Sequence, residues 1–318
     1  MREYLIKRLL FVIPTLLGIT LVVFCVMQLI PGDPADVLLG QDYNQEVARQ
    51  LRADWGLDQP LLVQYAKWLG HILQGDWGRS FFSRKPVLAE VWEKLPISLQ
   101  LIAFSMFFAL LIAVPAGALA AVKAHGKWDY GAMTFALFGV SIPEFFLGIL
   151  LFLTFGLSLG WLPVQGYVAP YENLLENLRH MILPAIALGA SRAAILTRLV
   201  RGSMLEVIRQ EYVTTARSKG LREVVVIAKH ALRNALIPAV TVMGLQVGFL
   251  VGGAIIIEKL FAIPGLGSYG IDAITNRDYT QVQGFILVSA SIFVVANLCV
   301  DFIYCFLDPR IRYGSAEA

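Results

Sequence analysis

The stretch RGSMLEVIRQEYVTTARSKGLREVVVIAKHALRNALIP, residues 201–238, is a basic interval between two strongly apolar runs, with seven Lys or Arg against three Glu. Gly220 divides it, because glycine weakens a helix interior and adopts backbone angles that other residues avoid. The interval therefore predicts two short amphipathic helices hinged at Gly220. The apolar face of the second helix follows a 3.6-residue period and consists of Leu221, Val224, Val225, Ala228, Leu232, Ala235 and Leu236.

The composition of the whole chain indicates where this interval lies. Of 318 residues, 57% are hydrophobic and only 15% are charged, whereas about one-quarter of an ordinary soluble domain is charged. The apolar residues form runs of about 20, the length of a helix that crosses a bilayer core, and they do not alternate as barrel strands do. The sequence therefore predicts an all-α integral membrane protein. The net charge of +3 is too small to indicate a nucleic acid partner.

Six apolar runs are predicted to cross the membrane. The fourth is the weakest because it contains Arg192 and Arg198, but without it residues 201–238 would face outside, against the tendency of Lys and Arg to stay in the cytoplasm. With six spans and both termini in the cytoplasm, the cytoplasmic segments hold 14 of the 26 Lys and Arg. The predicted spans cover residues 9–30, 96–122, 130–159, 181–200, 235–257 and 282–307.

This topology divides the chain into four parts. The first span is expected to remain uncleaved, because its apolar run is longer than that of a signal peptide and no small-residue cleavage site follows it. The insert after it contains amphipathic helical segments at residues 61–73 and 86–95. The predicted parts are the first span with a cytoplasmic N-terminus (1–31), a small helical extracytoplasmic insert (32–95), the transmembrane core (96–307) with its cytoplasmic loop (201–238), and a cytoplasmic tail (308–318).

Three glycines recur every four residues in the fifth predicted span, at Gly244, Gly248 and Gly252. In lipid, such a stripe of small residues allows another helix to approach closely. The stripe is compatible with general packing inside the bundle, with an interface to another subunit, or with a pore wall. In each case, a leucine at position 248 should be disruptive.

Glu144 follows Pro143 in the middle of the third predicted span. An acidic residue is costly at that depth, so a place on a transport pathway or in a charge pair is the default interpretation. The alternative is that the helix breaks at Pro143 and the carboxylate reaches water near a cavity. Arg192 and Arg198 are expected to extend toward the cytoplasm or to pair within the bundle.

Several chemical functions find no support in the sequence. The histidines are scattered, and no HExxH or CxxC pattern indicates a metal site. No GxxxxGK[ST] phosphate loop is present, so ATP hydrolysis is not expected in this chain, and no GxSxG pattern indicates a hydrolase. The sequence thus predicts no catalytic, cofactor-binding or metal residue. From the residues alone, the interval 201–238 could also be a pair of amphipathic helices that lies on the inner surface of the membrane.

Several motifs resemble those of a known family. EYVTTARSKG followed by KHALRNALIP resembles the cytoplasmic coupling loop, often called the EAA loop, of the membrane subunits of bacterial ABC importers. Five further motifs are similar to the first-type permease subunit of importers for dipeptides, oligopeptides, glutathione and nickel. They are LIPGDP, GLDQPL, FAIPGLG, NRDY and LDPRIRY, which begin at residues 29, 56, 261, 276 and 307. The resemblance covers nearly the whole chain.

This resemblance implies a type I ABC importer transmembrane domain in the bacterial inner membrane. The chain would pair with a second, homologous permease subunit, and each would form half of a translocation pathway that works by alternating access. Two ATP-binding subunits would dock beneath the pair and bind ATP and Mg, and a periplasmic binding protein would deliver the substrate. The implied substrates are short peptides, with nickel or glutathione as the alternatives.

The resemblance also implies which residues transmit ATP hydrolysis to the spans. The coupling helix would lie near residues 212–220, with Ala216 and Gly220 as the Ala and Gly of the loop motif. Thr214 stands where the general motif has Glu, and Arg233 stands where it often has Pro. The residues expected to couple to the ATPase are Glu211, Tyr212, Thr215, Ala216, Arg217, Lys219 and Gly220.

Two other classes of function remain open from the residues alone. An ion-coupled secondary transporter would show more ionisable groups within the spans, or broken helices in repeated halves, and Glu144 is its only support. A membrane receptor would use the insert at residues 32–95 as its binding module. Copurification of an ATPase would separate these two classes from an ABC importer.

Overall fold

The computed structural model describes residues 2–29, 39, 44–54 and 56–307. Of the LIPGDP motif only Leu29 lies within these residues, and of the LDPRIRY motif only Leu307. The predicted tail at residues 308–318 is likewise outside the described part of the chain.

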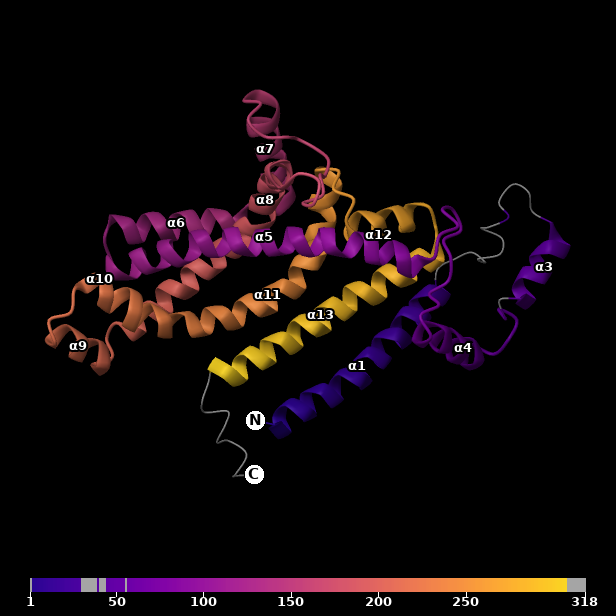
Figure 1. The fold of residues 1–318 in the computed structure, drawn as a ribbon, viewed down its shortest axis with the longest axis horizontal. Coiled ribbons are helices and arrows are strands. Elements are labelled where there is room, and N and C mark those ends of the chain that lie inside the picture. Colours follow the sequence, from indigo (N-terminus) through magenta and orange to yellow (C-terminus); the bar gives the residue numbers. More distant parts are fainter. Residues whose placement is uncertain (1, 30–38, 40–43, 55, 308–318) are drawn as a thin grey trace.

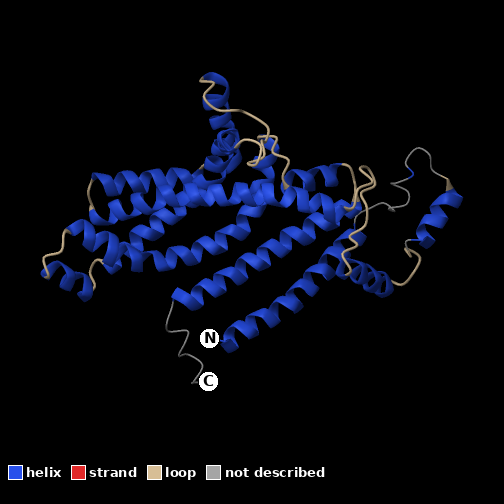
Figure 2. Cartoon of the chain, in the orientation of Figure 1, coloured by secondary structure: helices blue, strands red, loops and turns tan. Residues whose placement is uncertain are grey.

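Helices account for all of the regular structure in the described residues, apart from an isolated bridge between Arg79 and Pro86 (Figure 2). Five helical segments are long and apolar enough to cross a membrane. The helices that contain them are α1 (Arg2–Leu29), α5 (Val87–Val122), α8 (Leu174–Val207), α11 (Leu232–Leu260), which continues a shorter helical segment, and α13 (Tyr279–Leu307).

The third predicted span is broken. It consists of α6 (Lys127–Ser141), α7 (Glu144–Leu151) and the π-helical segment η2 (Phe152–Ser158), and the two halves meet at 102°. The break follows from Pro143, because proline has no N–H to donate and disfavours helical angles in the residue before it. Figure 1 shows α7 leaving the bundle at a steep angle to α6. Counted as one span, the bent pair gives six candidate spans and agrees with the prediction.

The centre of the bundle is the contact between α5 and α8, the two helices that supply most of its large buried core. They approach closely because glycines face backbone at the contact. A Cβ atom on Gly189 would lie 2.5 Å from the carbonyl oxygen of Ser105, and one on Gly117 would lie 2.8 Å from that of Thr197. In a membrane, where apolar packing alone gains little, such close backbone approach holds helices together.

Two predicted boundaries are wrong. The amphipathic piece predicted at residues 86–95 is not separate, since α5 begins at Val87 and continues through Pro96 without a break. In the interval 201–238, only the first predicted helix is independent, as α9 (Glu211–Ser218). The second, formed by α10 (Glu223–Val225) and the π-helical segment η3 (Val226–Ala231), runs on into α11 as one long helix.

The short elements gather at the two ends of the elongated molecule (Figure 1). At one end lie α9 and α10. At the other lie α4 (Leu61–Leu73) from the predicted insert and α12 (Leu266–Thr275), with α3 (Gln45–Asp54) farther out. The hydroxyl of Tyr65 on α4 lies 2.9 Å from the hydroxyl of Thr20 on α1, so the insert is tied to the first span.

Candidate functional site

The first candidate site is α9, the helix predicted to couple the chain to an ATPase. Val213 is buried and Ala216 is only 6% exposed, and both pack against Val226 of η3. The small side chain of Ala216 therefore lets α9 lie close to its own chain and points away from the free surface. The other predicted coupling residues are exposed: Glu211, Tyr212, Thr215, Arg217, Lys219 and Gly220.

Two polar contacts join α9 to the beginning of the long helix. Arg217 donates through Nη2 and Nε to the two carboxylate oxygens of Glu223, at 2.8 and 3.2 Å, and this contact raises the pKa of Arg217 above its usual value. Asn234 donates through Nδ2 to the Tyr212 hydroxyl at 2.7 Å. Together with the buried Val213 and Ala216, these bonds connect α9 to the base of α11. A displacement of α9 should therefore reach a helix that spans the membrane.

Gly220 forms the turn between α9 and α10, as the sequence predicted. Its φ is +75°, in the left-handed region that side chains with a Cβ rarely adopt. No heavy atom lies within 4 Å of the place a Cβ would take, so the need for glycine comes from backbone angle and not from crowding. Thr214 and Arg233, the two positions at which the motif of the resembled family differs, are both exposed.

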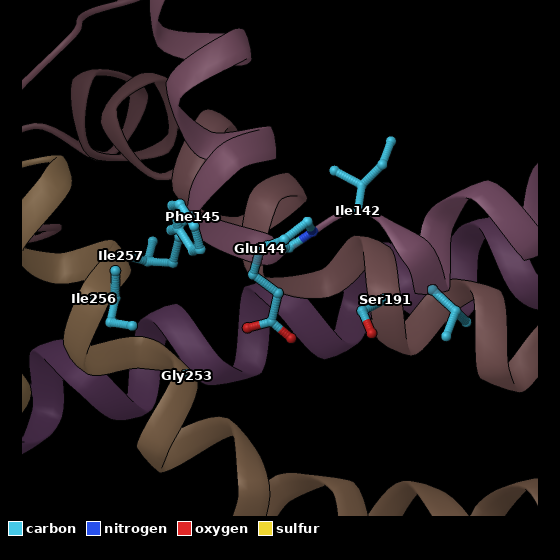
Figure 3. A pocket seen from close by; sticks show the side chains of 9 residues that line it. Ile142, Glu144, Phe145, Ser191, Gly253, Ile256 and Ile257 are labelled. Carbon is cyan, nitrogen blue, oxygen red and sulfur yellow. The ribbon is translucent and has the colours of Figure 1, made fainter.

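The second candidate site is a cavity at the break between α6 and α7 (Figure 3). Glu144 is the first residue of α7, and its Oε1 lies 3.2 Å from Nη2 of Arg192 on α8. Pairing within the bundle was one of the two outcomes expected for Arg192. The cavity has a volume of about 310 Å³ and is lined by Val140, Ile142, Pro143, Glu144, Phe145, Ser191, Gly253, Ile256 and Ile257.

Two glycines of the predicted stripe on α11, Gly248 and Gly252, have different surroundings. A Cβ on Gly248 would collide with the ring of Phe293 on α13, so this glycine serves packing inside the bundle. Gly252 is exposed, and no atom lies near the place of its missing side chain. Gly253, outside the stripe, faces the cavity, where a Cβ would lie 2.7 Å from Oε2 of Glu144. Helical spacing alone could not separate these three environments.

A second ion pair, which sequence reasoning missed, joins α6 to α8. Asp129 is 2% exposed and accepts two bonds from Arg201, from Nε at 2.5 Å and from Nη2 at 2.7 Å. It also accepts the backbone N–H of His125, so all of its partners are supplied within the chain. The signal available in the sequence was an acidic residue just before an apolar run, although nothing in the sequence identified its partner.

The FAIPGLG motif surrounds a buried acid that sequence reasoning also missed. Glu258 is 0% exposed, accepts a bond from the Ser98 hydroxyl at 2.5 Å and accepts another from the backbone N–H of Ser268 at 2.9 Å. A Cβ on Gly265 would collide with its carboxylate, and one on Gly267 would also approach it closely. The FAIPGLG motif therefore forms the cradle of this carboxylate at the start of α12.

The NRDY motif fixes the loop before α5. Asp278 is 0% exposed and accepts a bond from the Ser80 hydroxyl at 2.7 Å and another from the Phe81 backbone N–H at 2.8 Å. Beside it, Glu90 of α5 accepts bonds from Tyr269 and Gln281, and burial together with Glu90 raises the pKa of Tyr269. These contacts make one connected polar network at the end of the molecule that carries α4 and α12.

Within the described residues, no group of three or more His, Cys, Asp or Glu side chains is arranged to hold a metal ion. Glu144 lines the cavity, Nη2 of Arg192 lies 3.2 Å from its Oε1, and α9 offers an exposed polar face.

Comparison with known proteins covers nearly the whole chain. Residues 113–313 match the family described as binding-protein-dependent transport system inner membrane component, and residues 1–103 match the N-terminal membrane component of the same transport systems. The chain is 42% identical to a dipeptide transport system permease protein of Alkalihalophilus pseudofirmus and 43% identical to a glutathione transport system permease protein of Salmonella typhimurium. Each alignment covers 98% of this chain and 100% of the relative.

Among solved structures, the chain is similar to the MetNI methionine ABC transporter in an inward-facing conformation. The TM-score is 0.56 at 18% sequence identity, and the match covers 69% of this chain and 96% of that one. At this identity, the likeness supports the fold alone.

Proposed function

The chain belongs to the family of binding-protein-dependent transport system inner membrane components and is a permease subunit of an ABC importer, and from that premise we propose that its substrates are short peptides. The support is the similarity over the full length to permeases of dipeptide and glutathione systems. The two identities differ by one percentage point, so similarity does not choose between these substrates. A chain that handles dipeptides and one that handles glutathione share the need to bind a small ligand with charged ends.

ATP hydrolysis takes place, on this proposal, in two separate ATP-binding subunits that dock on the exposed face of α9. The observation that supports this role is the attachment of α9 to α11 through Glu223, Asn234 and the buried Val213 and Ala216. A push on Tyr212 or Lys219 would be passed to a membrane-spanning helix. No cofactor is needed in this chain, because ATP and Mg would be bound by the partners.

A second, homologous permease subunit completes the pathway, and a periplasmic binding protein delivers the substrate. The topology that goes with this assembly has both termini and residues 201–238 in the cytoplasm, the insert at residues 32–95 outside, and the core at residues 96–307 in the membrane. The separation of α9 from α4 and α12 at opposite ends of the molecule supports it (Figure 1).

Topology is tested by cysteine labelling at Ser218, the last residue of α9. In a chain freed of its native cysteines, Ser218→Cys should react with a membrane-impermeant maleimide only in inside-out vesicles. Labelling in right-side-out vesicles alone would contradict the six-span arrangement.

The coupling role is tested by Gly220→Asp. An aspartate at φ +75° is less favourable than glycine, and it adds a negative charge to the exposed turn that joins α9 to α10. We expect the variant to be inserted and paired with its partners, while ATP hydrolysis no longer drives uptake of dialanine in proteoliposomes. Gly202→Asp, the same substitution at a helical glycine of α8 with no atom within 4 Å of the place of its missing side chain, serves as the matched control. Normal uptake by Gly220→Asp would count against coupling through α9.

Copurification gives the broadest test of the whole proposal. An affinity-tagged chain expressed with its genomic neighbours should bring down two ATPase copies and one further permease. A chain that transports on its own with an ion gradient would instead favour a secondary transporter.

A further inference from the structure

We propose that α4 is anchored at the edge of the bilayer by an apolar face that lies against phospholipid acyl chains. The face consists of Leu62, Ala66, Leu69 and Leu73, which are spaced three or four residues apart and so lie on one side of the helix. The contact depends on the place of this chain in the inner membrane, and it is independent of the substrate and of the coupling to ATP hydrolysis.

A different side of α4 holds the helix to the bundle. Trp68 and Ile72 pack against a buried cluster formed by α1, α12 and α13, and the Trp68 indole N–H donates to Oε1 of Gln283 at 3.1 Å. The ring of Phe24 on α1 lies 5.5 Å from that of Tyr65 and 5.8 Å from that of Trp68. One side of α4 is thus fixed by ring packing and a hydrogen bond, which leaves its other sides free.

The proposed face is left open by the rest of the described chain. Leu62 and Leu73 are 81% and 78% exposed, and Ala66 between them is exposed as well. None of the four side chains packs in a hydrophobic cluster of the described residues. Large apolar side chains that gather on one exposed face mark a surface that meets another apolar surface. The partner of this face therefore lies outside the described chain.

The contacts with α1 place α4 beside the membrane span and not beyond its end (Figure 1). The candidate span of α1 ends at Leu29, and Thr20, whose hydroxyl lies 2.9 Å from that of Tyr65, is roughly 14 Å before that end at 1.5 Å per residue. Closer to the end, Nε2 of Gln28 donates to Oε1 of Gln64 at 3.4 Å. With 13 residues, α4 is roughly 20 Å long and too short to cross a bilayer core of about 30 Å. It therefore lies where the apolar core meets the headgroups.

A third side of α4 is polar and suits the water beside such an interface. Lys67, His71 and Gln74 are exposed and follow the same spacing, next to the apolar face. Helices that lie in a membrane interface are divided in this way, with basic residues on the polar face and leucine on the other. A lysine in such a position keeps its stem along the apolar surface and its ammonium group in water.

The kinds of side chain on α4 favour lipid over a protein partner. Protein interfaces gain most of their binding energy from Trp, Tyr and Arg, and leucine is under-represented among the residues that dominate it. The aromatic residues of α4, Tyr65 and Trp68, face the bundle, while the open face carries only leucine and alanine. This face also runs from the first turn of the helix to its last residue, so lipid can cover it over its whole length.

Spin labels on α4 test which phase each side of the helix meets in the assembled transporter. The native cysteines are replaced by serine, and Leu62→Cys or Leu73→Cys is labelled and reconstituted with its partner subunits in vesicles of phosphatidylethanolamine and phosphatidylglycerol. Power saturation compares collisions with oxygen, which concentrates in lipid, and with nickel ethylenediaminediacetate, which stays in water. Lys67→Cys and Gln74→Cys, on the polar side, are the matched controls. We expect oxygen collisions to exceed nickel collisions at the two leucine positions, and the reverse at the two controls.

Two results would overturn the proposal. Nickel collisions that exceed oxygen collisions at both leucine positions would show that water covers the face, and rare collisions with both reagents would show that a protein covers it. Where a label at either leucine prevents assembly, Ala66→Cys gives the same comparison from the middle of the face with a smaller change. Uptake of dialanine by vesicles with the parent transporter tests the proposed transport function separately, and its absence would leave the lipid contact intact.

Discussion

Glu144 and Glu258 are both acids in the apolar part of the chain, but the surroundings of the two carboxylates are opposite. Glu258 is completely buried, accepts bonds from Ser98 and from the Ser268 backbone, and is enclosed by two glycines. Glu144 has one cation at 3.2 Å and an open cavity beside it. The difference separates an acid whose partners all lie within the fold from one that keeps an open side, and we expect the first to matter more for stability.

The largest effect expected from this comparison is that of Glu258→Leu. The substitution removes the acceptor for two buried donors and places a branched side chain in a cradle shaped for a carboxylate, so we expect a loss of about 3 kcal/mol or more. Thermal unfolding of the purified complex in detergent, followed by size-exclusion chromatography, measures it. Ser98→Ala, which removes one donor, should cost less. A melting temperature equal to that of the parent would show that the cradle contributes nothing to stability.

Gly248→Leu is expected to rank next, and Gly252→Leu gives a matched control on the same helix. Leucine at 248 must displace the ring of Phe293, so overpacking should cost about 1 to 3 kcal/mol, whereas leucine at 252 meets no atom within 4 Å. The two variants differ only in position, and the comparison of their melting temperatures isolates the contact between α11 and α13. Equal destabilisation would mean that the whole stripe forms one interface in the assembly.

The smallest effect on stability is expected for the ion pair of Glu144 and Arg192. In a double-mutant cycle of Glu144→Gln and Arg192→Gln, the coupling energy should be about 1 kcal/mol or less, because the contact is single, long and partly exposed. The corresponding cycle of Asp129→Asn and Arg201→Gln should give a larger value, since that pair has two short bonds and a buried carboxylate. Coupling energies of equal size would show that the two ion pairs, Glu144 with Arg192 and Asp129 with Arg201, contribute equally to stability.

Of the two acids, Glu144 could be recognised from the sequence and Glu258 could not. Glu144 was recognised from the sequence because it lies in the middle of an apolar run beside a proline, where an acid is costly. Glu258 lies at the end of its run, where charged residues are common, so nothing in the sequence singled it out. The glycines at 265 and 267 were the available signal, but they fit an ordinary turn equally well.

The structure of residues 201–238 could likewise be predicted only in part. The break at Gly220 and the short helix before it could be predicted, because they depend on local backbone preference and on periodicity. The burial of Ala216 against Val226, and the bonds of Arg217 and Tyr212 to Glu223 and Asn234, could not. These contacts depend on how the turn folds α9 back on the long helix.

The sequence by itself therefore determined the membrane class, the spans and the hinge at Gly220, and it offered the kink at Pro143 as one of two alternatives, since hydropathy, proline and glycine act within a few residues. Only the tertiary structure decided which charged groups are satisfied. Glu258 meets a serine 160 residues away, and Glu144 meets an arginine on another helix. A pairing of that kind has no local signature, because its energy depends on the distance between side chains and not on their order along the chain.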